Sequence, residues 1–333
     1  MRFGPVPLEA ALGAILAHSH PGAGGRLRKG RVLEAADLAA LAAEGVTQLV
    51  MARLEPDDLD EDTAAAELAA ALVPDPVAQG LTRSEAFTGR VNLNAMGPGI
   101  VELDAGAVHA LNLVDPAITL ATLPRHCRVE AGTLVGTVKI ISYGVAAEAV
   151  ARAAALARAA LSVRPVVMRR AGLILTVVPG QDPKLNAKGA KVIGARLAAL
   201  GIEMAGLREV AHDEATIAAA LRDLPGDLAL ILTGSATSDL HDTAPQAVRA
   251  AGGQVERFGM PVDPGNLLFL GWLQGRPVIG LPGCARSPAL NGADWVLERL
   301  ACGLAVTGED IAAMGVGGLL KEIPSRPQPR EAR

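Results

Sequence analysis

The sequence predicts an α/β protein with a mostly parallel sheet in its C-terminal half and an α+β module with a β-rich part in its N-terminal half. From residue 169 onward, apolar strand-like runs alternate with helical runs of about 10–15 residues, the pattern of βαβ units. Residues 87–142 form shorter segments bounded by Gly, Pro or Asp, which is typical of β-rich structure. The 333 residues, half of them apolar, leave room for two domains at roughly 150 residues each.

Composition excludes several classes of function. The net charge is −4, and two Trp, one Tyr and four Phe are too few for a stacking platform, so we expect no nucleic-acid partner. No stretch approaches the ~18 uncharged apolar residues of a membrane helix. Glu9 interrupts any signal-peptide pattern, and the three widely spaced cysteines suggest neither disulfides nor a zinc site. We expect a cytoplasmic protein with no membrane partner.

In the N-terminal half, apolar spacing predicts a helix over residues 8–18 and another over residues 35–44 that ends at Gly45. A strand is expected over residues 46–52. Residues 57–72 place acids ahead of an alanine-rich run, which suits the first turn of a helix better than a metal site.

A helix over residues 146–162 precedes a break at Pro165, where we place the domain boundary. The predicted organisation is an accessory module over residues 1–165, an α/β domain over 166–320 and a Pro-rich tail or linker over 321–333. Within the second domain, strands are expected at 169–180, 203–210, 227–236, 254–260 and 277–283, with helices at 187–201, 213–224 and 243–253.

Ligands of such sheets bind at the carboxyl ends of the strands, so loops that follow strands are the candidate sites. The first loop precedes a helix and is rich in small residues, which let backbone N–H groups approach an anion. Its candidate residues are Thr233, Gly234, Ser235, Ala236, Thr237, Ser238 and Asp242. The loop contains neither a Walker A nor a GxGxxG motif, and an ordinary strand-to-helix turn explains the same residues.

Two Pro-Gly turns complete the set. One carries Pro264, Gly265 and Asn266, and the other carries Pro282, Gly283, Cys284, Arg286 and Ser287. The guanidinium of Arg286 suits a phosphate, and the Ser287 hydroxyl can donate a hydrogen bond.

The order of these motifs resembles the molybdopterin-binding domain of molybdopterin molybdotransferases. A TG-initiated loop that ends in Asp242 is followed by GGQVERFGMPV, a PG turn and GLPG, over roughly residues 169–303. A second resemblance spans nearly the whole chain. Segments such as MRFGPVPLEAALGAILAHS, FGMPVDPGNLL and MGVGGLLKEIPSRPQPRE resemble the N-terminal part of bacterial proteins that fuse a molybdopterin-binding domain to a molybdenum-cofactor cytidylyltransferase.

The resemblance implies a three-layer αβα domain that binds molybdopterin or the molybdenum cofactor, and a homodimer. It also implies that Asp242 holds Mg²⁺ and serves as the catalytic carboxylate. Two positions depart from the family: Asn266 replaces a lysine, and residues 187–189 replace a DSN-like stretch with its carboxylate. Both losses weaken the case for molybdate insertion more than the case for pterin binding.

Other side chains near these loops have competing interpretations. Lys188, with Lys184 and Lys191, could receive a phosphate at a helix N-terminus, or could be solvated lysines on a helix face. Cys284 is a soft metal donor or a small packed residue, and His241 is more readily explained by solvent exposure than by base catalysis.

The leading hypothesis is a pterin-binding protein that holds the cofactor for nucleotide transfer or delivery, with a cytidylyltransferase domain or a molybdoenzyme as its partner. The alternatives are a Mg²⁺-dependent molybdotransferase, a nucleotide pyrophosphate hydrolase and a structural protein with a decayed site. Each alternative differs from the leading hypothesis in chemistry that a binding or turnover assay can detect.

Overall fold

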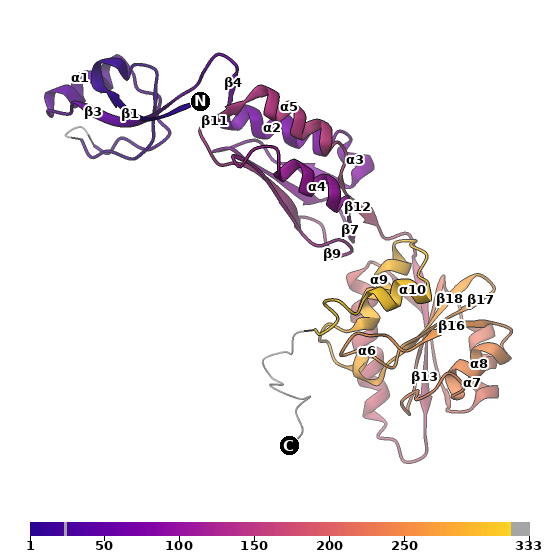
Figure 1. The fold of residues 1–333 in the computed structure, drawn as a ribbon. Helices are drawn as coiled ribbons and strands as arrows, with labels where there is room; N and C mark the ends of the chain where they lie inside the picture. The colour runs from indigo at the N-terminus through magenta and orange to yellow at the C-terminus, as the bar shows by residue number, and fades with distance from the viewer. Residues whose placement is uncertain (23–24, 321–333) are drawn as a thin grey trace. The chain divides into compact units, whose positions relative to one another are not determined.

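The computed structural model describes residues 1–22 and 25–320, and the chain divides into two compact units. The first unit comprises Met1–Gly97 and Val101–Val163, and the second comprises Pro98–Ile100 and Arg164–Arg333 (Figure 1). The predicted tail over residues 321–333 lies outside the described residues.

The first unit begins with a small lobe whose three-stranded sheet has the order β1-β3-β2. Its elements are β1 (Arg2–Pro7), the 3-10 helix η1 (Leu8–Ala10), β2 (Ile15–Leu16), α1 (Ala35–Ala43) and β3 (Gln48–Arg53). The predicted helix over residues 35–44 is α1, but the predicted helix over residues 8–18 is wrong. Gly13 has φ +72°, outside the helical region, and Ile15 and Leu16 pair with β3 instead.

The rest of the first unit mixes short strands with four helices. The elements are β4 (Asp58–Asp60), α2 (Glu61–Leu72), α3 (Pro76–Gln79), β5 (Leu81–Arg83), β6 (Arg90–Ala95), β7 (Gly99–Leu103), α4 (Ala105–Asn112), β8 (Ile118–Thr122), β9 (Arg128–Val129), β10 (Leu134–Ile140), β11 (Gly144–Ala146), α5 (Ala147–Leu156) and β12 (Leu161–Pro165). Helix α2 begins at Glu61, later than predicted, because the Asp60 carboxylate accepts the N–H groups of Asp62 and Thr63. Helix α4 lies inside the region predicted to be β-rich, and β12 replaces the end of the predicted 146–162 helix.

The second unit is built on a six-stranded mixed sheet with the order β14-β13-β15-β18-β17-β16. The strands are β13 (Arg170–Val177), β14 (Glu203–Ala211), β15 (Leu228–Leu232), β16 (Gln254–Phe258), β17 (Phe269–Leu273) and β18 (Arg276–Leu281). Strands β14, β13, β15 and β18 are parallel neighbours, whereas β17 pairs antiparallel with both β18 and β16. Strand β17 was not expected from the sequence.

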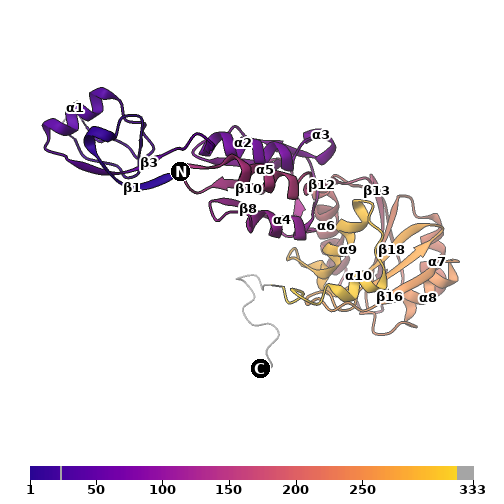
Figure 2. The same ribbon diagram turned by 45° about the horizontal axis from the view of Figure 1, so that its top comes forward.

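Alternate side chains of the sheet enter two separate cores. Leu173, Leu230 and Ile279 share one cluster with residues of α6 (Lys184–Ala199) and α9 (Gly292–Ala301). Ile174, Ile231 and Val278 share the other with residues of α7 (Glu214–Asp223) and α8 (Thr243–Ala250). The two helix pairs therefore cover opposite faces of the sheet (Figure 2). The helix α10 (Gly308–Ala313) packs beside α9 through Ile311.

The pairing pattern also fixes where the strands end. The carboxyl ends of β13, β14, β15 and β18 lie at one edge because these strands are parallel. Strand β16 ends there too, since Phe258 pairs with Phe269 and Phe269 with Gly280. Loops that the sequence separates by more than a hundred residues therefore meet at one edge.

None of the helices in the described part of the chain is long and apolar enough to span a bilayer.

Candidate functional site

The candidate site is the carboxyl edge of the six-stranded sheet in the second unit. Five connections lie there, over residues 178–183, 212–213, 233–242, 259–268 and 282–291. The N-termini of α6 and α8 follow two of these connections, and helix N-termini favour anions.

The loop over residues 233–242 is packed tightly onto the end of β13. The N–H of Gly234 donates to Thr176 Oγ1 at 2.8 Å. A Cβ at Gly234 would lie 2.2 Å from Gln181 Oε1 and 2.8 Å from the Thr176 carbonyl oxygen, so only glycine fits there. Gln181 is itself held by Asn186, to which its Nε2 donates at 3.0 Å.

The remaining predicted residues of this loop differ in accessibility. Thr233 and Thr237 are buried, whereas Ser235, Ala236 and Ser238 are exposed. The exposed part presents small side chains and backbone to solvent, as a phosphate cradle requires.

Asp242 is the last residue of the loop and the N-cap of α8. Its two carboxylate oxygens accept the N–H groups of Thr243 at 2.7 Å and Ser238 at 2.8 Å. Burial disfavours the charged form, but these hydrogen bonds and the charge of His212 outweigh burial and hold the pKa of Asp242 below its ordinary value. Asp242 therefore stays ionised and has a structural role in the loop before any ligand arrives.

We expect Asp242→Ala to lower the free energy of unfolding by about 1 kcal/mol at pH 7, the usual loss for a helix cap. Because folding lowers the pKa of this carboxyl, its contribution is present above the ordinary value of about 4 and is lost as pH falls through the folded value. The difference between wild type and variant should therefore shrink below pH ~4. Denaturant titrations at pH 7 and 3.5 measure it, with Asp239→Ala as a control in the same loop. An equal difference at both pH values would contradict this role.

Arg286 is the predicted residue whose position most clearly indicates a ligand. Its side chain is 9 % exposed, and its Nη2 donates to the Thr233 carbonyl oxygen at 2.7 Å, which joins the loop after β18 to the loop after β15. Its Nε is buried and has no hydrogen-bond partner among the described residues. Burial lowers the pKa of the guanidinium, which still remains charged. A buried cation with no carboxylate paired to it in the described chain is costly and suits an anionic ligand.

The loop that carries Arg286 is held by Arg196 of α6, a residue that the sequence analysis missed. The Arg196 side chain donates to the carbonyl oxygens of Ala285, Ser287 and Ala289 at 2.8–2.9 Å and pairs with Asp294 of α9. Asp294 also accepts the N–H of Asn291, so one partly buried ion pair joins α6, the loop and α9. Arg196 is a positioning residue for Arg286.

The Pro264-Gly265 turn is fixed against the start of α9. The Pro264 carbonyl oxygen accepts the N–H of Gly292 at 2.8 Å, and Gly265 has φ +144°. A Cβ at Gly265 would lie 2.8 Å from the Gly292 nitrogen. Asn266 is exposed and donates to the Met260 carbonyl oxygen at 3.3 Å, so its amide stabilises the turn itself.

The remaining predicted residues are mostly exposed, and two of them make local hydrogen bonds. Lys188 is exposed, and so are Lys184 and Lys191 of the same helix. Cys284 is exposed and accepts a hydrogen bond from Asn291 Nδ2 at 3.0 Å, whereas Ser287 accepts the N–H of Ala289 through its hydroxyl. Pro282 is buried and Gly283 is exposed beside Arg286.

A second missed residue, His212, follows β14 at the same edge. Its Nδ1 lies 2.9 Å from Thr176 Oγ1, the atom that also accepts the N–H of Gly234. The sequence signal for His212 was a polar residue soon after a predicted strand, because that position lies at the ligand-binding edge of the sheet.

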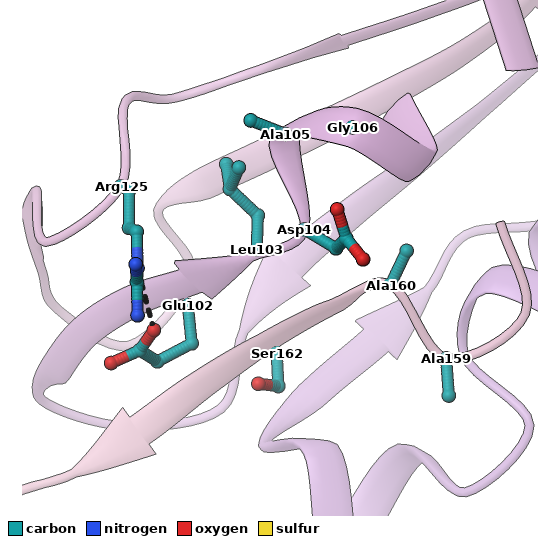
Figure 3. A pocket seen from close by; sticks show the side chains of 9 residues that line it. All are labelled: Glu102, Leu103, Asp104, Ala105, Gly106, Arg125, Ala159, Ala160 and Ser162. Carbon is teal, nitrogen blue, oxygen red and sulfur yellow. Dashed lines mark hydrogen bonds and ion pairs between the residues drawn. The ribbon is translucent and has the colours of Figure 1, made fainter. Parts of the chain in front are cut away.

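A cavity of about 620 Å³ lies in the first unit and was not predicted. Figure 3 shows Glu102, Asp104, Arg125 and Ser162 around it. Arg125 pairs with Glu102 at 3.0 Å, and Asp104 caps α4 by accepting the N–H of Ala107. The cation of this pocket is thus already neutralised, unlike Arg286. Among residues 1–22 and 25–320, no group of three or more His, Cys, Asp or Glu side chains could hold a metal ion.

Comparison with known protein families gives a match to a short N-terminal segment of the chain. A domain of unknown function, DUF8806, matches residues 5–53. No curated protein matches the chain.

Similar solved structures include a molybdopterin biosynthesis MoeA protein from Pyrococcus horikosii. It is 14 % identical over 91 % of this chain and 75 % of that chain, with a TM-score of 0.31. The protein CinA of unknown function from Thermoplasma acidophilum is 18 % identical over 35 % of this chain and 90 % of that chain, with a TM-score of 0.25. At these sequence identities and TM-scores, the similarity does not indicate a function.

Proposed function

We propose that the second unit binds molybdopterin or the molybdenum cofactor through its phosphate and holds it for nucleotide transfer or delivery. The observation that carries the proposal is the buried, uncompensated guanidinium of Arg286 at the edge where the loops meet. An anion placed there would remove the cost of the unpaired charge.

Three further features support a phosphate. The loop over residues 233–242 exposes small side chains ahead of α8, and α6 begins at the same edge. The order of the TG loop, the PG turn and GLPG resembles molybdopterin-binding domains as a set. The helices on both faces of the sheet fit the three-layer αβα arrangement that this resemblance implies.

The test is calorimetric titration of the full chain with molybdopterin. We expect saturable binding that inorganic phosphate displaces, and at least about tenfold weaker binding of neopterin, which has no phosphate. Equal binding of neopterin would overturn the role of the anion site, and no binding of molybdopterin would overturn the proposal. Delivery is tested separately by adding a cytidylyltransferase domain and CTP and measuring whether this chain accelerates cofactor cytidylation.

A Mg²⁺-dependent molybdotransferase is the second candidate, because Asp242 remains ionised at this edge. Proteins commonly hold Mg²⁺ through one or two carboxylates together with phosphate oxygens. Asp242 would supply the single carboxylate, and the ion would neutralise charge on the phosphate. Formation of active cofactor from adenylated molybdopterin and molybdate, with loss in Asp242→Asn, would favour this candidate.

A further inference from the structure

His212 is held at the candidate site by a short hydrogen-bonded chain. The N–H of Gly234 donates to Thr176 Oγ1 at 2.8 Å, which leaves the hydroxyl hydrogen of Thr176 free to point at His212 Nδ1, 2.9 Å away. With the hydroxyl hydrogen directed at Nδ1, the neutral imidazole carries its own hydrogen on Nε2, and a protonated imidazole carries a hydrogen on Nε2 as well. This contact fixes the orientation of the ring and leaves Nε2 as the ring nitrogen that can meet a ligand.

The Nε2 side of this ring is available to a ligand. His212 is half-buried, and within the described ranges no group accepts a hydrogen bond from Nε2. His212 and Asp242 are close enough for the imidazole charge to act on the Asp242 carboxylate. The His212 imidazole and the ionised Asp242 carboxylate are therefore neighbours at this edge.

This part of the edge is separated from the anion site. His212 follows β14, whereas Arg286 reaches the Thr233 carbonyl oxygen at the end of β15, and β13 lies between these strands. Two strand spacings amount to roughly 10 Å. A free phosphate at Arg286 cannot reach His212, but a phosphate joined to a planar heterocycle can.

We propose that His212 donates through Nε2 to a carbonyl oxygen or ring nitrogen of the ligand's heterocycle, at the far end from the phosphate bound by Arg286. The site then selects a phosphorylated pterin or guanine-like ring over a simple anion, with Asp242 as the acceptor for its ring N–H and amino groups. This inference rests on the proposed function and names the part of the ligand that His212 contacts. Thr176 acts as a positioning residue through His212.

The experiment compares GMP with inorganic phosphate by calorimetric titration of the full chain. Asparagine at position 212 retains an atom near the place of Nδ1 but is too short to replace Nε2, whereas glutamine reaches the place of Nε2. We expect His212→Asn to weaken GMP binding about five- to tenfold, as for one lost hydrogen bond, and to change phosphate binding less than twofold. His212→Gln should recover part of the GMP affinity. His241→Asn, the same change at an exposed histidine beside Asp242, should alter neither.

The outcomes separate the two proposals. Phosphate binding that depends on Arg286, together with GMP affinity unchanged in His212→Asn, would overturn the role of His212 alone. An equal loss of GMP and phosphate affinity would do the same, because it would indicate general damage to the edge. If the wild type bound neither GMP nor phosphate, the proposed function would be overturned. Thr176→Ser, which keeps the hydroxyl that contacts both His212 and Gly234, should bind GMP and phosphate as the wild type does.

Discussion

Replacing Arg286 with methionine is expected to weaken phosphate binding by about 100-fold or more and to leave the second unit almost as stable as before. The loss in affinity follows because the guanidinium is the one cation buried among the described loops of the edge. Stability should change little, because removal of an uncompensated buried charge offsets the lost hydrogen bond to Thr233. Calorimetric titration measures the first effect. Thermal unfolding measures the second, for which we expect a shift below about 3 °C.

Arg276 provides a matched control at the opposite end of β18. Burial also lowers the pKa of this guanidinium, but its donors bind the carbonyl oxygens of Leu221 and Leu224 near the end of α7. Arg276→Met should therefore destabilise the fold by about 1–3 kcal/mol and leave phosphate affinity unchanged. Equal effects of the two substitutions on phosphate binding would show that Arg286 has no special role.

Replacing Arg196 with methionine is expected to lower the free energy of unfolding by about 3–5 kcal/mol. The substitution strands three carbonyl oxygens of the loop over residues 285–289 and leaves Asp294 as an unpaired carboxylate that is 11 % exposed. Phosphate binding should weaken as well, because the same loop carries Arg286. Denaturant unfolding and phosphate titration of the same preparation measure both effects.

Lys191 is the matched control for Arg196, since it lies on the same helix and is exposed. Lys191→Met should change the free energy of unfolding by less than about 0.5 kcal/mol. Arg196→Lys keeps the charge opposite Asp294 but loses the planar fork, so an intermediate stability is expected. Wild-type stability in Arg196→Met would show that the hydrogen bonds of Arg196 are not needed to hold the loop.

The sequence alone predicts most strands and helices of the second unit, because these elements alternate with clear apolar periods. It was insufficient where local spacing and tertiary pairing disagree. Residues 8–18 have helical spacing, yet Gly13 takes a positive φ and the following residues pair with a strand more than thirty positions away. Helix α4 is short and alanine-rich, and its capping residue Asp104 was the available signal.

The candidate loops could be predicted because they follow strands, but the side chains that organise them could not be found by motif alone. Arg196 lies seven residues after Gly189 and three after Ile193, so it falls on the buried side of α6. A guanidinium on an apolar stripe is a signal for a buried partner, although the sequence does not identify Asp294, nearly a hundred positions later. The Thr176–His212 contact is hidden for the same reason, since it joins the ends of two neighbouring strands.

The three residues Pro98–Ile100 belong to the second unit, although the chain on either side of them belongs to the first. Ile100 is fully buried in the core cluster shared by α6 and α9. A single cut or recombination event at residue 164 would therefore transfer the sheet and its loops but leave Ile100 behind, with a cavity in its place. Exchange of this unit between proteins requires three crossovers, before Pro98, after Ile100 and before Arg164, which favours inheritance of both units together.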